Sequence, residues 1–136
     1  MIQAEAINHL GIAVRSIEEH KDFYQRVLGA EFESVEEVPS QKVRVGFFRI
    51  GDVRLELLEP TDPSSSVATF IEKRGEGLHH VAYTVADIKS RIAELQAGGV
   101  RMIDAEPRPG AHNTRIAFVH PKSSGGVLTE LCEPSH

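Results

Sequence analysis

Two histidines and two glutamates stand in segments of this chain that repeat each other. His9-Leu-Gly-Ile-Ala-Val returns as His80-Val-Ala-Tyr-Thr-Val, and Val53-Arg-Leu-Glu56-Leu-Leu-Glu-Pro returns as Val127-Leu-Thr-Glu130-Leu-Cys-Glu-Pro. The separation is 71 residues for the histidines (9 to 80) and 74 for the glutamates (56 to 130). A duplicated module with one His and one Glu in each copy is therefore predicted, and the four side chains are predicted to share one metal site.

Imidazole and carboxylate ligands without a thiolate suit a divalent ion such as cobalt, nickel, manganese, iron or zinc. A bound ion of this kind is a Lewis acid, and it stabilises the negative charge that forms when a proton leaves the carbon beside a carbonyl group. A carboxylate within hydrogen-bonding reach of that carbon can act as the base. The ligand set therefore predicts enolisation chemistry. A lone His or Glu on a strand is more often structural, so the hypothesis rests on the agreement between the two copies.

The first copy is predicted to fold as βαβββ. Ser16 and Glu19 form a capping box, which predicts a helix that begins near Ile17 and ends before Gly29. Alternating apolar residues and the Gly51-Asp52 turn predict strands on both sides of this helix. The predicted strands are 7–14, 31–37, 43–50 and 53–59.

The second copy repeats this order, with a helix capped by Asp87 and stopped at Gly98-Gly99. Its strands are predicted near 80–85, 100–104, 114–119 and 126–132. Between the copies lie a Pro/Ser loop at 61–66 and a short predicted helix at 67–74. The expected fold class is α+β, with one domain over residues 1–136 that comprises a first module at about 5–60, a connector at 61–78 and a second module at about 79–134.

The two-residue period of a strand predicts where the four polar side chains point. In the first strand Leu10, Ile12 and Val14 share the face that packs on the helix, and His9 shares the other face with small residues. His80, beside Ala82, follows the same rule. Glu56 and Glu130 lie opposite the apolar neighbours of their own strands. Both carboxylates are therefore expected on the same concave face as the histidines.

Composition limits the classes of function. With 15 Lys and Arg against 20 Asp and Glu, the formal charge is −5, which provides no global attraction for nucleic acid. The single cysteine, Cys132, cannot form an intramolecular disulfide, and the first residues lack the pattern of a secretory signal. No apolar stretch approaches the ~20 residues that span a bilayer. A cytoplasmic protein without a membrane or nucleic-acid partner is expected.

Three stretches resemble the vicinal oxygen chelate superfamily and, within it, the methylmalonyl-CoA epimerase family. They are Asn8-His9-Leu-Gly-Ile-Ala-Val, Lys73-Arg-Gly-Glu-Gly-Leu-His-His80-Val-Ala-Tyr, and His120-Pro-Lys-Ser-Ser-Gly-Gly-Val-Leu-Thr-Glu130-Leu. The resemblance covers nearly the whole chain. It implies a mixed sheet curled around a metal-containing cup, a homodimer, and interconversion of the (R) and (S) forms of methylmalonyl-CoA. It also implies His9, His80 and Glu130 as metal ligands, with Glu56 at the fourth position.

The resemblance implies a mechanism in which the metal binds the thioester carbonyl, the C2 proton is removed to give a metal-stabilised enolate, and a proton returns on the opposite face. Glu130 is the first candidate for the acid–base group. Some family members carry a second carboxylate two residues after the Val43 position, where this chain has Val45. Glu56 or a water molecule is then expected to act as the second base.

The coenzyme A moiety needs cationic and backbone contacts. The candidates in the predicted loops are Arg108, Arg115, Lys122, Gly125 and Gly126. Cys132 shares parity with Glu130 and is either a packed hydrophobe or part of the cup lining. His79 is expected to point away from the site, and no catalytic role is assigned to the histidines that lack an internal counterpart. These are His20, His112, His120 and His136.

Two other functions compete with the epimerase. Two His with two Glu also resemble the metal site of glyoxalase I, a lactoylglutathione lyase that acts on a hemithioacetal. A non-catalytic small-molecule binding protein of the same fold needs no metal, and the complete ligand set argues against it. Metal analysis separates the binding protein from the enzymes, and deuterium exchange at C2 of methylmalonyl-CoA separates the two enzymes.

Overall fold

The computed structural model describes residues 2–135 and divides into two compact units. The central unit is the continuous segment 9–79, and the terminal unit combines the residues up to 8 with those from 80 onward. The chain crosses between the units twice, and His9 and His80 are the first residues after each crossing. Among the described helices, none has the length and apolar character needed to cross a membrane.

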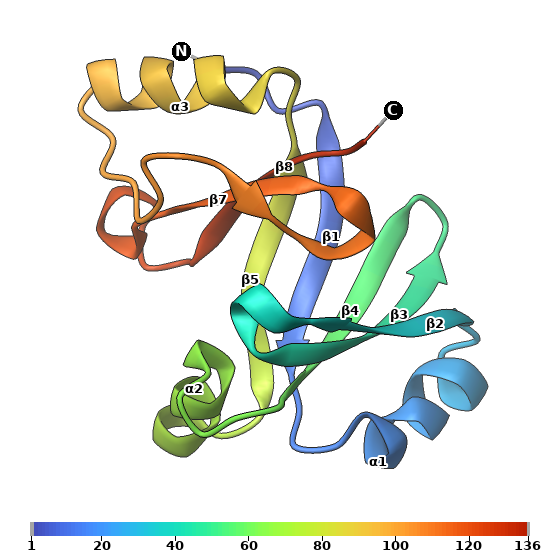
Figure 1. Cartoon of the computed structure of the whole chain (residues 1–136). Coiled ribbons are helices and arrows are strands. Elements are labelled where there is room, and N and C mark those ends of the chain that lie inside the picture. Colours follow the sequence, from blue (N-terminus) through green and yellow to red (C-terminus); the bar gives the residue numbers. More distant parts are fainter. Residues whose placement is uncertain (1, 136) are drawn as a thin grey trace. The chain divides into compact units, whose positions relative to one another are not determined.

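The central unit is a mixed four-stranded sheet with the order β2-β3-β4-β1 (Figure 1). Strand β1 pairs with β4 in parallel, whereas the β2–β3 and β3–β4 pairs are antiparallel. One helix follows β1, and a second helix follows β4. The elements are β1 (Ala6–Ala13, of which the residues from His9 belong here), α1 (Ile17–Asp22) continued by the π-helical turn η1 (Phe23–Val27), β2 (Glu31–Val38), the 3₁₀ turn η2 (Pro39–Gln41), β3 (Val43–Ile50), β4 (Val53–Pro60) and α2 (Ser66–Arg74).

The terminal unit repeats this plan with the strand order β5-β8-β7-β6. The β5–β8 pair is parallel, and the remaining pairs are antiparallel. Its elements are β5 (Gly77–Thr84, of which the residues from His80 belong here), α3 (Ile88–Ala97), β6 (Arg108–Pro109), η3 (Ala111–Asn113), β7 (Arg115–Val119), η4 (Pro121–Ser123) and β8 (Thr129–Glu133). The predicted α+β class and the two βαβββ modules are confirmed.

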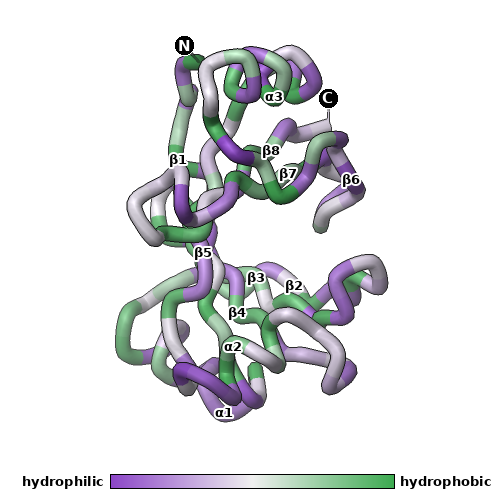
Figure 2. The backbone as a smooth tube through the Cα atoms, turned by 90° about the vertical axis from the view of Figure 1, so that its left-hand side faces the viewer, coloured by the Kyte–Doolittle hydropathy of each residue, from purple (hydrophilic) through white to green (hydrophobic). Residues whose placement is uncertain are grey.

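In each unit the helix that follows the first strand covers one face of the sheet. The side chains of Ile17 and Leu57 meet in the core of the central unit, and Ile92 and Leu131 meet in the core of the terminal unit. Figure 2 shows hydrophilic and hydrophobic residues alternating along α3, as an amphipathic helix requires. Burial of each such aliphatic side chain contributes about 1.5–3 kcal/mol. The helices leave the other face of each sheet free for the His and Glu side chains and their neighbours.

Most predicted elements lie within a few residues of those observed, but one predicted strand is wrong. Near residues 100–104 only an isolated bridge, from Met102 to Val119, is formed, and β6 at Arg108–Pro109 pairs with β7 instead. In this segment the Asp104 carboxylate accepts the backbone N–H of Phe118 at 2.8 Å. The Asp104 side chain thus binds a backbone N–H that would otherwise pair with a neighbouring strand, and regular strand pairing ends there.

The two predicted helix caps differ in the structure. The Ser16 hydroxyl accepts the Glu19 N–H at 3.3 Å, as the capping box predicts. Asp87 occupies the N-cap position of α3, but it has a left-handed backbone with φ of 49°. Its carboxylate accepts a hydrogen bond from the Ser90 hydroxyl at 2.7 Å.

Candidate metal centre

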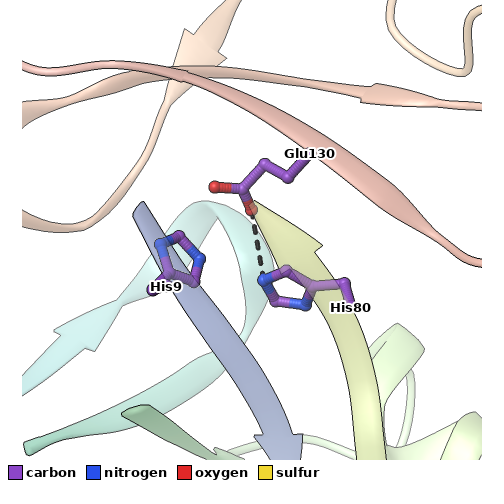
Figure 3. Close-up of side chains that lie close together, drawn as sticks. All are labelled: His9, His80 and Glu130. Atoms are coloured by element: carbon purple, nitrogen blue, oxygen red, sulfur yellow. Dashed lines mark ion pairs between the residues drawn. The ribbon is translucent and has the colours of Figure 1, made fainter. Parts of the chain in front are cut away.

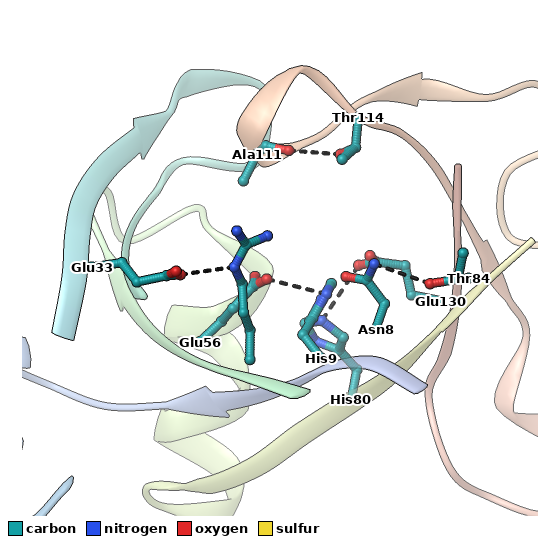
Figure 4. Close-up of polar contacts among 10 residues, drawn as sticks. Asn8, His9, Glu33, Glu56, His80, Thr84, Ala111, Thr114 and Glu130 are labelled. Atoms are coloured by element: carbon teal, nitrogen blue, oxygen red, sulfur yellow. Dashed lines mark hydrogen bonds and ion pairs between the residues drawn. The ribbon is translucent and has the colours of Figure 1, made fainter. Parts of the chain in front are cut away.

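His9 and Glu56 form a buried pair in the central unit. They lie on the parallel neighbours β1 and β4, where Gly11 is the in-register partner of Glu56 and Arg54 that of His9. The His9 Nδ1 atom is 3.1 Å from Glu56 Oε2, and the two residues are only 5% and 7% exposed (Figure 4). Because Gly11 has no side chain, the Glu56 carboxylate can lie over β1 and reach His9.

Burial controls the protonation of this pair. Desolvation and, to a smaller extent, the nearby Arg54 charge lower the pKa of His9 to about 3. Desolvation also raises the pKa of Glu56 to about 8, where Arg54 opposes the shift and Glu36 adds to it. At neutral pH the imidazole is therefore neutral, with a lone pair available to a cation. The Glu56 carboxyl must lose its proton when it binds a cation.

His80 and Glu130 form the corresponding pair in the terminal unit. They lie on the parallel neighbours β5 and β8, and Ala82 is the in-register partner of Glu130. His80 Nε2 is 3.3 Å from Glu130 Oε1 (Figure 3), and the residues are 4% and 3% exposed. The ring of Phe118 meets the His80 ring edge-on at a centroid distance of 5.5 Å. A small residue opposite the glutamate is thus common to both pairs.

The donor atoms of each pair fit neighbouring ligands of one transition-metal ion. Two ligand atoms bound at about 2.1 Å and at a right angle are separated by about 3.0 Å. The separations of 3.1 Å and 3.3 Å agree with this value. Nitrogen and oxygen donors that are buried and carry few competing solvent contacts suit cobalt, nickel, manganese or zinc. Each unit therefore contains half of a plausible divalent-metal ligand set.

A salt-bridge cluster beside the first pair was missed by sequence reasoning. Glu33 accepts Arg54 Nε at 2.9 Å and Arg49 Nε at 3.1 Å, one arginine on each carboxylate oxygen. Arg54 lies two residues before Glu56 on β4 and therefore shares its face. The face on which Arg54 lies could have been predicted from the sequence. The position of Glu33 could not, because it depends on an irregularity in β2.

The histidines without an internal counterpart have other contacts. His20 contacts Glu76 at 3.3 Å through Nε2, and its Nδ1 lies 2.9 Å from the Ser16 carbonyl oxygen. His120 accepts the backbone N–H of Lys122 and caps η4. The ring of His79 lies edge-on to Phe70, and burial lowers the pKa of His79 to about 4.

Two further histidines also lack a counterpart in the other sequence repeat. His112 has a left-handed backbone in η3. His136 lies outside the described residues.

The residues suggested for coenzyme A are spread over the β6–β8 part of the terminal unit. Arg108 contacts Asp104 at 3.4 Å, and Arg115 contacts Glu133 at 3.4 Å. Lys122 is exposed in η4. The Gly126 N–H donates to the Pro121 carbonyl at 2.8 Å, so this amide is already engaged. Gly125 and Gly126 both have positive φ, which fits a tight turn after η4.

Val45 and Cys132 are both buried in apolar surroundings. Val45 is 2% exposed and is in register with Leu58 of β4. Cys132 is 1% exposed and packs with Ile116 and Phe118 in a small hydrophobic cluster. Cys132 is thus a packed hydrophobic residue in this fold.

The sequence from residue 8 to residue 118 matches the model of the glyoxalase/bleomycin resistance protein/dioxygenase superfamily. The chain belongs to this superfamily. The membership confirms the expected vicinal oxygen chelate fold, and proteins of this superfamily typically hold a divalent metal.

Several relatives of the chain within the superfamily are full-length matches. The uncharacterized protein YqjC of Bacillus subtilis is 46% identical over 94% of this chain and 91% of its own length. The ethylmalonyl-CoA/methylmalonyl-CoA epimerase of Cereibacter sphaeroides is 37% identical over 92% of this chain and 95% of the relative. A solved methylmalonyl-CoA epimerase, in complex with methylmalonyl-CoA and NH4+, is 37% identical with a TM-score of 0.93, covering 98% of this chain and 96% of that one. These superfamily members place the chain among isomerases of the racemase and epimerase class.

Proposed function

We propose that this chain is a metal-dependent epimerase that interconverts the (R) and (S) forms of methylmalonyl-CoA. The observation that carries the proposal is the pair of equivalent buried His–Glu contacts, at 3.1 Å and 3.3 Å, in a chain of which 92% matches relatives named for this activity. The proposal treats residues 1–136 as a single catalytic domain, because each unit supplies only half of the ligand set.

His9, Glu56, His80 and Glu130 would together hold one divalent ion, such as cobalt, zinc, nickel or manganese. The bound ion supplies Lewis-acid stabilisation for the negative charge that develops on the thioester oxygen. The neutral state of His9 and the buried carboxyl of Glu56 suit this role, since both present lone pairs in a poorly solvated site. The four side chains come from β1, β4, β5 and β8.

Proton transfer at C2 falls to the carboxylates of this chain. Glu130, 3% exposed on β8, takes the C2 proton of one isomer, and low solvent access protects the resulting carbanion from uncontrolled protonation. Inversion requires a proton from the opposite face of the carbon. Glu56 and water are the donors suggested by the sequence.

The acyl-CoA substrate needs cationic and backbone contacts for its phosphates, and we assign these to Lys122, Arg115 and the turn at Gly125 and Gly126. The exposed position of Lys122 in η4 supports this assignment. Action as a homodimer in the cytoplasm completes the proposal, with the single, buried Cys132 consistent with a reducing compartment. The formal charge of −5 argues against a nucleic-acid partner.

The experiment is deuterium incorporation at C2 of methylmalonyl-CoA in D₂O, followed by mass spectrometry, with metal content measured on the same samples. Wild-type protein is expected to incorporate deuterium and to equilibrate the two isomers. His80→Gln is expected to lose both activities, whereas His79→Gln, a change at the adjacent residue of β5, retains them. Wild-type protein with full metal occupancy and no exchange would refute the epimerase assignment.

A glyoxalase I-type lyase is the second candidate, because two His and two Glu form its ligand set as well. The lyase predicts turnover of a glutathione hemithioacetal and no exchange at C2 of methylmalonyl-CoA. A non-catalytic binding protein predicts purification without stoichiometric metal and no turnover of either compound. Assaying both substrates on one metal-analysed preparation separates the three functions.

A further inference from the structure

An irregularity in β2 determines which way Glu36 points. The strand pairs Phe32 with Phe48 and then Ser34 with Phe47, so Glu33 is an extra residue in a β-bulge. Such a bulge shifts the alternation of all the following side chains. Phe32 packs in the hydrophobic core with Phe48, so without the bulge Glu36 would share that face. With the bulge, Glu36 lies on the opposite face.

That opposite face is the one that carries the first His–Glu pair. Glu36 is in register with Val45, and β3 pairs Phe47 with Glu56. Val45 and Phe47 are two residues apart and share a face, so Glu36 and Glu56 share it too. From strand and residue spacings, their backbones are roughly 12 Å apart.

The electrostatics agree with this placement. The charge of Glu36 acts on Glu56 strongly enough to contribute to the raised pKa of that carboxyl, after burial, which is the main cause. Glu36 is half-buried, whereas its neighbours Val35 and Glu37 are exposed. Between Glu36 and Glu56 the face presents the apolar side chain of Val45.

The other charged groups on this face are poor proton donors and acceptors. Arg49 and Arg54 keep their protons throughout the ordinary pH range. Glu33 accepts hydrogen bonds from both arginines. Desolvation raises the pKa of Glu33, but these hydrogen bonds and charges outweigh it and hold the pKa below its usual value. Glu31 is exposed and in register with Arg49, at the other end of β2. Glu36 is thus the carboxyl group of this face best suited to exchange protons with a substrate.

We propose that Glu36 is the second acid–base residue of the epimerisation, a role that rests on the proposed function. Glu130 accepts the C2 proton, and the electrons of the broken C–H bond form the enolate of the thioester. Glu36, in its acid form, then donates its proton to C2 on the other side, and the enolate electrons form the new C–H bond. Glu130 ends protonated and Glu36 ionised, and exchange with water restores both. The opposite isomer reacts in reverse.

Glu36→Gln separates this role from a structural one. We expect the variant to keep its metal content and its thermal unfolding temperature, because Gln is isosteric and Glu36 lies outside the metal ligands. The isomer whose proton faces Glu130 should still exchange deuterium at C2 but return without inversion, so that interconversion falls at least 100-fold. Glu37→Gln, one residue away and on the opposite face, is the control and should epimerise normally.

A second variant tests whether a carboxylate on this face is what the inversion requires. Glu36→Gln combined with Val45→Glu returns a carboxylate to the same face from the neighbouring strand, and we expect it to recover at least a tenth of the lost interconversion. Glu36→Gln that epimerises at the wild-type rate, or that loses exchange of both isomers while keeping its metal, would overturn the proposal. Absence of exchange in the wild-type protein would instead refute the proposed function.

Discussion

Gly11 and Glu56 are in-register neighbours on the parallel strands β1 and β4. The missing side chain of Gly11 leaves room for the buried Glu56 carboxylate to approach His9 at 3.1 Å. Ala82 and Glu130 repeat the relationship on β5 and β8. Small residues opposite the glutamates are thus a requirement of the candidate metal centre, although Gly11 and Ala82 have no side chain that could bind a metal.

Gly11→Val is therefore expected to displace Glu56 and to lower metal occupancy at least tenfold. Overpacking of this site should also lower the free energy of unfolding by about 1–3 kcal/mol. Ile12→Val, at the next residue and on the face that packs against the helix, should keep full occupancy. Metal analysis after dialysis against a limiting ion gives the comparison, and normal occupancy in Gly11→Val would contradict the packing argument.

Metal binding should release a proton from Glu56. Burial raises the pKa of this carboxyl to about 8, so at pH 6.5 it is protonated before binding and ionised afterwards. Titration calorimetry in buffers of different ionisation enthalpy should report about one proton released per ion at pH 6.5 and less at pH 9. In Glu56→Gln the release should disappear. An unchanged proton count in this variant would show that the proton comes from another group.

The pH dependence of stability in chelator-treated protein should be a plateau with two declining sides. The pKa of His9 is lowered from 6.5 to about 3, so the unfolded chain binds the extra proton and stability falls as the pH decreases below 6.5. The pKa of Glu56 is raised from 4.5 to about 8, so the folded chain binds the extra proton and stability falls as the pH increases above 4.5. Between pH 4.5 and 6.5 the two effects oppose each other.

Urea unfolding at several pH values measures this profile. We expect losses of up to about 1 kcal/mol per pH unit below pH 4.5 and between pH 6.5 and 8. Glu56→Gln should remove the alkaline decline, and His9→Gln should remove the acid contribution of that residue. A Glu56→Gln profile that still declines between pH 6.5 and 8 would assign the effect elsewhere.

Arg54 should influence metal affinity without binding the ion. Its charge favours the ionised form of Glu56 and the neutral form of His9, which are the forms that bind metal. Arg54→Gln should therefore shift half-maximal metal binding to higher pH. Arg44→Gln removes an equally ion-paired arginine from the opposite face of the same sheet and should have no such effect. Equal shifts in the pH of half-maximal metal binding in the two variants would show that the effect comes only from the change in overall charge.

The sequence repeat singled out His9, Glu56, His80 and Glu130 because residue type, spacing and strand parity agreed in both copies, and all four are buried in the structure. Glu36 and Glu33 were not predicted, because parity counted along β2 fails after a bulge, and the composition of Glu31–Val38 carries no signal for one. The prediction of a strand at 100–104 was wrong for a similar reason. The Asp104 side chain bonds a backbone N–H there, a tertiary contact that local propensity does not register.

The boundary between the units does not coincide with the boundary between the sequence repeats. The first residues of the first repeat belong to the terminal unit, where Asn8 Nδ2 donates to Thr84 Oγ1 at 3.1 Å and the Glu5 N–H donates to the Thr84 carbonyl at 2.9 Å. A fragment that ends near Arg74 would keep His9 and Glu56 but lose Thr84. A chain of that half length would have to obtain this partner from another polypeptide, whereas the tandem chain supplies it within one molecule.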